Sequence, residues 1–223
     1  MLTKTQYTVN RDLIDQACSE SIGLEFKQAV NEPSGNFFYD PWVIKKEFKD
    51  TVWDRILQTL SFNVGEARII TLPHGKCYQS HGDIDDRYHL NISSHYAYII
   101  NLETEKMYPL MTDCIWYEMD AGPRHTAVNF GYSDRIQLVV RKLLDNNLLE
   151  NGINIKMFYS DSDKDKVRFI FDDIISPWLN KSYKEKTISD FSYQHNDVRF
   201  KITESKLSEL KNLLPKHFNI EIL

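Results

Sequence analysis

The chain has 223 residues, of which 42% are hydrophobic, so it can bury a core as one domain or as one domain with a small appendage. A net charge of −5 and an isoelectric point near 5.8 argue against a nucleic-acid-binding protein, which normally presents a basic face. No apolar run approaches the roughly 18 residues of a membrane span, and the polar start lacks the apolar core of a signal peptide, so we expect a cytoplasmic protein with no membrane partner.

The first 64 residues combine short apolar stretches with a cluster of turn formers at 31–36. Between Lys45 and Leu60, apolar side chains recur at four-residue spacing, which predicts an amphipathic helix packed against the outside of a sheet. The aromatic segment 37–42 has two interpretations. It could line a substrate entrance, or its rings could simply cap the open end of the core.

Residues 66–142 change to short apolar segments separated by polar turns. The predicted strands are 67–72, 88–93, 96–101, 114–119, 126–130 and 135–141. Several short strands at this spacing indicate an all-β sandwich or barrel.

After Asn151 the pattern changes again. The predicted elements are strand 153–159, helix 164–181, strands 187–193 and 198–203, helix 205–214 and strand 218–223. Residues 161–163 supply candidate N-caps for the first helix, and Pro177 within it should kink or end it. This β-α-β-β-α-β order suits a ferredoxin-like appendage, which divides the chain into domains 1–150 and 151–223.

His81 and Asp83 are the most informative pair in the chain. Two residues apart on an extended strand, their side chains project from the same face. With His125 from a distant strand they would form the two-histidine, one-carboxylate facial triad that leaves positions open on non-haem Fe(II). The spacing alone is weak, because roughly one such match is expected by chance, and His195 and Asp197 repeat it.

The surrounding sequence carries a resemblance. Residues 116–130, Trp-Tyr-Glu-Met-Asp-Ala-Gly-Pro-Arg-His-Thr-Ala-Val-Asn-Phe, resemble the distal-histidine strand of the aspartyl/asparaginyl β-hydroxylase family of 2-oxoglutarate-dependent oxygenases. The resemblance extends to the Arg-x-His-Leu element at 87–90 and to residues 135–140, and so covers about 65–142. It is closest to the short bacterial branch that hydroxylates free proline, because the animal enzymes lack an equivalent of Asp83.

The resemblance implies a fold and a set of ligands. The expected fold is a double-stranded β-helix, a jelly-roll barrel that holds iron between its two sheets, flanked by N-terminal helices. His81, Asp83 and His125 would bind Fe(II). Arg135 would grip the far carboxylate of the co-substrate 2-oxoglutarate with its planar guanidinium.

Three further residues have two readings each. Arg87 and His89 match the family element, which implies contact with 2-oxoglutarate or with a substrate carboxylate. Alternatively, Arg87 pairs with Asp85 or Asp86 on the surface, and His89 is an ordinary packed histidine. Asn129 falls on the same face as the distal histidine and would touch substrate or make a structural hydrogen bond.

The predicted function is therefore a 2-oxoglutarate- and Fe(II)-dependent dioxygenase that uses O2 to hydroxylate an amino acid, or an amino-acid residue of a peptide or protein. A non-catalytic jelly-roll protein that binds a metal or a sugar is the alternative. A third reading makes the C-terminal unit a protein-binding module that recruits a macromolecular substrate.

Overall fold

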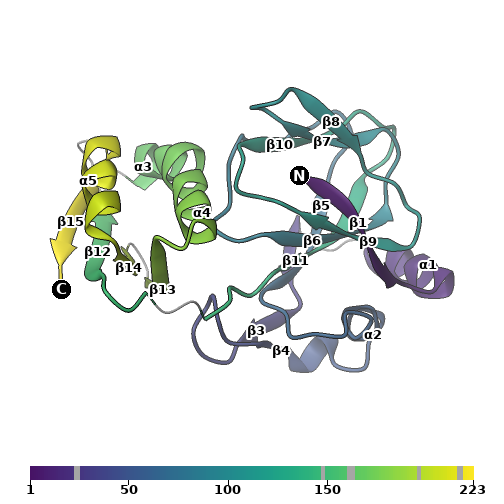
Figure 1. Ribbon diagram of the computed structural model, residues 1–223. Helices are drawn as coiled ribbons and strands as arrows, with labels where there is room; N and C mark the ends of the chain where they lie inside the picture. Colours follow the sequence, from purple (N-terminus) through teal and green to yellow (C-terminus); the bar gives the residue numbers. More distant parts are fainter. Residues whose placement is uncertain (23–25, 147–148, 160–163, 195–196, 215–217) are drawn as a thin grey trace.

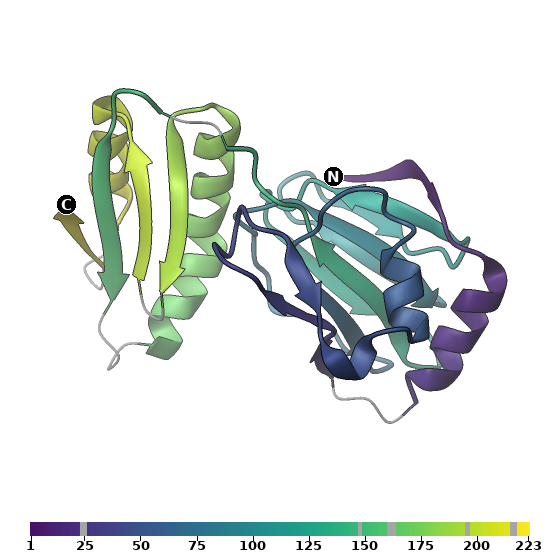
Figure 2. The same ribbon diagram turned by 90° about the horizontal axis from the view of Figure 1, so that it is seen from below.

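A computed structural model of the chain describes residues 1–22, 26–146, 149–159, 164–194, 197–214 and 218–223. Two units lie side by side, as Figures 1 and 2 show: a β-barrel with flanking N-terminal helices, and a smaller C-terminal unit of one sheet and its helices. The helix formed by α3 (Lys164–Ile170) and α4 (Ser176–Lys184) is the part of the C-terminal unit nearest to the barrel.

Two antiparallel sheets form the barrel. The larger sheet consists, in spatial order, of β1 (Leu2–Thr8), β9 (Ile115–Met119), β6 (Arg87–Ser93), β11 (Arg135–Arg141), β5 (Ala67–Leu72) and β2 (Lys27–Ala29). The smaller sheet consists of β10 (His125–Asn129), β7 (Ala97–Asn101) and β8 (Lys106–Pro109). Segment 76–81 runs antiparallel beside β10 and extends the smaller sheet through backbone hydrogen bonds.

Along the chain, these segments alternate between the two sheets. Strand β5 lies in the larger sheet and segment 76–81 in the smaller, β6 returns to the larger, β7 and β8 belong to the smaller, and β9, β10 and β11 alternate again. This winding is that of a jelly roll. The expected mainly β fold, a double-stranded β-helix with an α+β appendage, is therefore confirmed.

The two faces of the larger sheet differ in chemistry because side chains alternate along each strand. Its outer face packs an apolar core against α1 (Arg11–Glu20) and α2 (Val52–Leu57), and Leu90, Leu138 and Val140 are buried there. The opposite face of β6 and β11 carries buried polar side chains instead, namely Arg87, His89, Asn91, Arg135, Gln137 and Arg141. Buried polar groups need hydrogen-bond partners, which either the chain or a bound ligand can supply.

The predicted helix from Lys45 to Leu60 is shorter than expected. A 3-10 turn, Lys46–Phe48, precedes α2, and between them Asp50 adopts a positive φ of 62°, which breaks the helix. The apolar stripe still packs outside the sheet as predicted. Helix α1 fits the expectation of N-terminal helices beside the barrel, although its bounds were not predicted. Strands β1, β2 and β8 and the short hairpin of β3 (Asn31–Pro33) with β4 (Trp42–Ile44) were not predicted.

The C-terminal unit has the predicted order of elements. They are β12 (Ile153–Tyr159), α3 (Lys164–Ile170), the π-helical turn Phe171–Ile175, α4 (Ser176–Lys184), β13 (Ile188–Gln194), β14 (Asp197–Ile202), α5 (Glu204–Leu213) and β15 (Phe218–Ile222). The sheet order β13-β14-β12-β15 is antiparallel throughout and matches the ferredoxin-like arrangement. The candidate caps at 161–163 lie outside the described residues.

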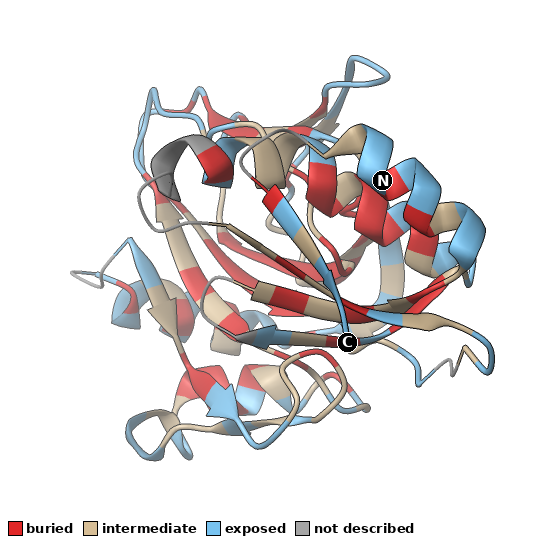
Figure 3. Ribbon diagram, turned by 90° about the vertical axis from the view of Figure 1, so that its left-hand side faces the viewer, coloured by how far each residue is buried: buried red, intermediate tan, exposed pale blue. Residues whose placement is uncertain are grey.

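Each unit has its own apolar core, and Figure 3 shows the buried side of the C-terminal helices turned toward their sheet. Phe38 and Ile84 of the barrel unit also join the C-terminal core, so the two units share a packed boundary. A domain boundary near residue 150 stays a prediction. Within the described ranges, no helix has both the length and the apolar character needed to cross a bilayer.

Leu138 tests the packing of the larger sheet. Its side chain is 0% exposed beneath α1 and α2, so Leu138→Ala should lower the free energy of unfolding by about 3 kcal/mol. Leu102→Ala, at a turn position that is 38% exposed, should cost under about 1 kcal/mol. Chemical denaturation of both variants checks this, and equal losses would contradict the assigned core.

Candidate metal centre

His81 and His125 lie directly opposite each other on neighbouring antiparallel segments. The backbone N–H of His81 donates to the His125 carbonyl at 3.0 Å, and the His125 N–H donates to the His81 carbonyl at 2.8 Å. Residues paired in this way project their side chains from the same face of a sheet. The two imidazole rings accordingly lie 4.4 Å apart, centroid to centroid.

Both imidazoles are oriented by backbone carbonyls. The Nδ1 atom of His81 lies 3.0 Å from the carbonyl of Gln79, and that of His125 lies 2.9 Å from the carbonyl of Pro123. A carbonyl can only accept, so each Nδ1 must carry the proton, and each neutral ring leaves its Nε2 lone pair available to a metal. Burial lowers the pKa of His125 to about 4, which keeps that ring neutral at pH 7.

Asp83 completes the cluster. One carboxylate oxygen lies 4.0 Å from His125 Nε2, and the other accepts from Arg87 Nη2 at 2.8 Å. Burial by itself would raise the pKa of Asp83, but the positive charge of Arg87 outweighs it and holds that pKa well below its usual range. The three potential ligand atoms all lie within 4.8 Å of one another. Two imidazoles and an ionised carboxylate at this separation fit one divalent transition-metal ion.

Gly82, between the two ligands on this loop, cannot be replaced without movement. A Cβ atom there would lie 2.4 Å from the carbonyl oxygen of Gly122 and 2.6 Å from Cγ of Pro177. Its N–H donates to the carbonyl of Asp172 at 2.7 Å. The contacts with Pro177 and Asp172 cross to the C-terminal unit, whereas Gly122 belongs to the barrel, so the metal-ligand loop is held from both sides.

Pro177 explains why that carbonyl is available. In the π-helical turn, the Ser176 N–H bonds to the carbonyl of Phe171, five residues back. The next bond of this type would run from residue 177 to Asp172, but proline has no N–H. The Asp172 carbonyl therefore bonds to Gly82 instead. The helix passes through Pro177 with a π-helical turn, so the proline does not end it.

Further bonds attach the same helix to the loop. Ser80 Oγ donates to Asp173 at 2.7 Å, and Asn180 Nδ2 donates to the carbonyl of Ile84 at 3.0 Å. Lys184 pairs with Asp86 at 2.9 Å. The segment from Ser80 to Asp86, which contains two of the three potential ligands, is therefore braced by α4 and the π-helical turn.

Arg135 lies on β11 inside the barrel, where the sequence predicted it. Its side chain is only 1% exposed, and Nη2 donates to the hydroxyl of Tyr78 at 2.9 Å. Among the described residues, Nε and Nη1 are buried without a hydrogen-bond partner. Leaving buried guanidinium N–H groups unpaired costs stability, so an anion such as a carboxylate would be stabilised beside this side chain.

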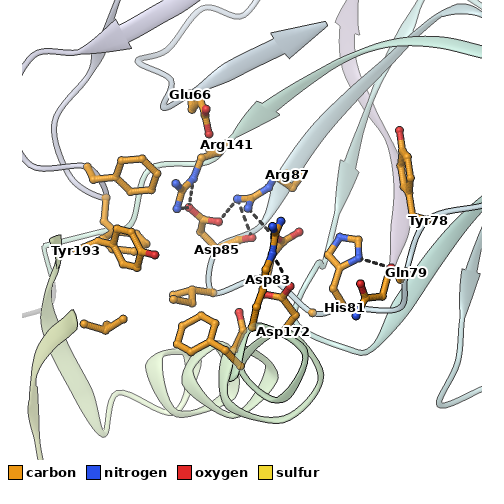
Figure 4. A pocket seen from close by; sticks show the side chains of 18 of the residues that line it. Glu66, Tyr78, Gln79, His81, Asp83, Asp85, Arg87, Arg141, Asp172 and Tyr193 are labelled. Carbon is orange, nitrogen blue, oxygen red and sulfur yellow. Dashed lines mark hydrogen bonds and ion pairs between the residues drawn. The ribbon is translucent and has the colours of Figure 1, made fainter. Parts of the chain in front are cut away.

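Arg87 pairs with Asp85, as in the alternative reading, but it does so in a buried ion-pair network and not on the surface. It donates to Asp83 and also to Asp85, and Asp85 in turn accepts from Arg141 Nε at 2.6 Å. Figure 4 shows Asp85 between the two arginines. The guanidinium of Arg87 therefore holds the carboxylate of Asp83 and has little capacity left for a substrate.

His89 lies two residues farther along the same face of β6. Both of its ring nitrogens are buried without a hydrogen-bond partner in the described part of the chain. Burial, reinforced by the charge of Arg135, lowers the pKa of His89 to about 3, so the ring is neutral. It also interacts electrostatically with His125, which places it near both the triad and Arg135.

Asn129 makes structural hydrogen bonds, as the second of its two readings predicted. Its Nδ2 donates to the carbonyls of Leu72 and Ser133, both at 2.9 Å, and its Oδ1 accepts from the Gly131 N–H at 3.0 Å. These bonds fix the turn between β10 and β11, and they leave the predicted substrate contact without support.

A pocket of about 610 Å³ opens beside the triad, and both units line it. Figure 4 shows His81 and Asp83 toward one side of this pocket and Arg141 and Tyr193 toward the other. Tyr78, Arg68 and the side of the pocket formed by the C-terminal unit were not predicted from the sequence. No local pattern marks these residues, because only the packing of distant segments brings them to the triad. The alternative pair His195 and Asp197 includes a residue, His195, that lies outside the described ranges.

Comparison with known proteins gives limited matches. No family model matches the sequence, and no curated protein matches it. A cupin domain from Bordetella pertussis Tohama I aligns over 34% of this chain and 78% of its own, with 13% identity and a TM-score of 0.31. The structure of CapF with the inhibitor 3-isopropenyl-tropolone aligns over 38% of this chain and 26% of its own, with 16% identity and a TM-score of 0.30. The jelly-roll assignment rests on the sheet order described above.

Gly82→Ala tests the loop between the two units. The added methyl group must displace the Gly122 carbonyl or Pro177, and with them His81 and Asp83. We expect at least a tenfold loss of Mn(II) affinity, measured by electron paramagnetic resonance, with an unchanged near-ultraviolet circular dichroism spectrum. Unaltered Mn(II) affinity in the folded variant would show that the triad does not bind the metal.

Stability of the metal-free protein should depend on pH through His89. Its folded pKa of about 3 lies below the unfolded value of 6.5, so the unfolded chain binds more protons between these limits, and stability falls as pH decreases through this window. From about pH 7 to about pH 5 this amounts to about 2 kcal/mol. His89→Gln should show a smaller decline in denaturation experiments, and parallel curves for the two proteins would contradict the buried neutral ring.

Proposed function

We propose that the protein is a 2-oxoglutarate- and Fe(II)-dependent dioxygenase that hydroxylates an amino acid or an amino-acid residue. The observation that carries the proposal is Arg135, a buried guanidinium with two nitrogens that have no partner among the described residues, in the same barrel as a His-Asp-His cluster. A keto acid that chelates a metal at this cluster would bring a carboxylate to such a group.

The residues present fit the metal and co-substrate. His81, Asp83 and His125 would occupy one side of the ion and leave the other open. Fe(II) bound there would let O2 and 2-oxoglutarate react to succinate and CO2, with the second oxygen atom transferred to a C–H bond of the substrate.

The protein's own groups prepare this reaction in three ways. Arg87 keeps Asp83 ionised and fixes the direction of its carboxylate. Arg135 would orient the co-substrate through its far carboxylate. His89, neutral and without a partner among the described residues, can donate to one oxygen and so help to align the same molecule.

A jelly-roll protein that binds a metal without oxygenase activity would explain the triad but would leave Arg135 unexplained. A separate recruiting module would likewise leave unexplained why the C-terminal unit braces segment 80–86 and lines the pocket. These contacts support a C-terminal unit that helps to build the site.

Arg135→Gln tests the co-substrate site. Anaerobic addition of Fe(II) and 2-oxoglutarate to the unmodified protein should give the weak visible charge-transfer band of the chelated keto acid. Loss of the charged, bidentate partner should raise the apparent dissociation constant of 2-oxoglutarate by about 100-fold, and Arg135→Lys by about tenfold.

Arg11→Gln, a surface charge change, is the matched control and should leave the band unaltered. Succinate release under air provides a second readout. Absence of the band and of succinate in the unmodified protein, with Fe(II) bound, would refute the oxygenase proposal.

A further inference from the structure

Two cations in the pocket are not used by the metal centre or its ion-pair network. Arg68 on β5 has a buried Nε with no hydrogen-bond partner in the described chain, and its Nη1 lies 3.5 Å from Glu66, a long ion pair. Lys27 on β2 also lines the pocket, and within the described ranges its ammonium group has no ion-pair partner.

Arg68 and Lys27 lie on the same face of the larger sheet. In the β2–β5 pair, Lys27 lies opposite Ile70 and Arg68 lies opposite Ala29, so the two basic residues are diagonal neighbours on one face. Partial desolvation and the charge of Arg68 lower the pKa of Lys27, in keeping with two like charges placed diagonally on one face. An anion between them would relieve their repulsion.

The other arginines of the pocket are already neutralised. Arg87 and Arg141 share Asp85, and Arg87 also holds Asp83. Arg168 pairs with Asp172 at 3.8 Å, and its side chain is 79% exposed, so solvent screens its charge. Among the described pocket residues, buried positive charge that no close carboxylate balances is therefore concentrated at Arg68, with the more exposed Lys27 as its diagonal neighbour.

The remaining wall is apolar and comes mainly from the C-terminal unit. Its side chains include Met157, Phe171, Val198 and Phe218, with Phe37 and Phe38 from the barrel unit. A volume of about 610 Å³ lies within the range of small-molecule sites. The pocket thus offers one anion site and a large apolar surface.

We propose that Arg68, assisted by Lys27, binds the free carboxylate of a small-molecule substrate whose apolar part packs against the aromatic wall of the C-terminal unit. This inference rests on the proposed function and narrows it. An internal apolar residue of a polypeptide carries no free carboxylate, so the substrate class is an apolar amino acid or a related carboxylic acid.

A matched pair of probes, 3-phenylpropionate and its uncharged amide 3-phenylpropionamide, tests this directly. Binding is measured by isothermal titration calorimetry on the full chain loaded with Mn(II) and an inert 2-oxoglutarate analogue, which occupies the co-substrate position. The acid should bind at least tenfold more tightly than the amide.

Arg68→Gln should weaken binding of the acid at least tenfold and leave binding of the amide unchanged, so the amide also reports that the variant is folded. Glu66→Gln, which removes the competing carboxylate, should strengthen acid binding a few-fold. Arg199→Gln, a charge change on β14 outside the pocket lining, is the matched control and should alter neither.

Equal binding of acid and amide, failure of the acid to bind, or unchanged acid binding in Arg68→Gln would each overturn the inference. The proposed function fails separately. If discrimination between acid and amide persists while the 2-oxoglutarate band is absent, the carboxylate site stands and the oxygenase does not. If the band forms and Arg68 has no effect, only the carboxylate site is refuted.

Discussion

The cross-strand pairing of His81 with His125 is the constraint on which the rest of the site depends. Two reciprocal backbone hydrogen bonds fix the register of segment 76–81 against β10. A slip of one residue would turn one imidazole to the other face of the sheet. The same register places Asp83, two residues farther on, where its carboxylate reaches His125 at 4.0 Å.

The buried arginines of the barrel differ in how their charges are compensated. Asp83 and Asp85 compensate the charges of Arg87 and Arg141. Removing any one of these side chains would destabilise the protein, because it would leave an unpaired buried charge. Arg135 has only the neutral hydroxyl of Tyr78 as its hydrogen-bond partner in the described chain. In the described chain, Arg135 thus lacks the carboxylate partner that Arg87 and Arg141 have, in the same barrel as a cluster of metal-ligand type.

Much of this arrangement was predictable from sequence, because strand periodicity and the His-x-Asp pattern are local signals. Strands β5 and β11 have the predicted bounds, and the three potential metal ligands do converge. The pocket wall was not predictable, since Gly82 meets Pro177 only through tertiary packing. For Asn129, strand periodicity predicted the face of the sheet correctly but could not show that its amide donates to the backbone carbonyls of Leu72 and Ser133.

The account is tested most directly by a crystal structure of the protein with Mn(II) and an inert 2-oxoglutarate analogue. We expect the metal to be bound by Nε2 of both histidines and by the Asp83 carboxylate, and the far carboxylate of the analogue to be held by the guanidinium of Arg135. A metal bound elsewhere, or an analogue that leaves the Arg135 guanidinium without an anion, would contradict the central claim.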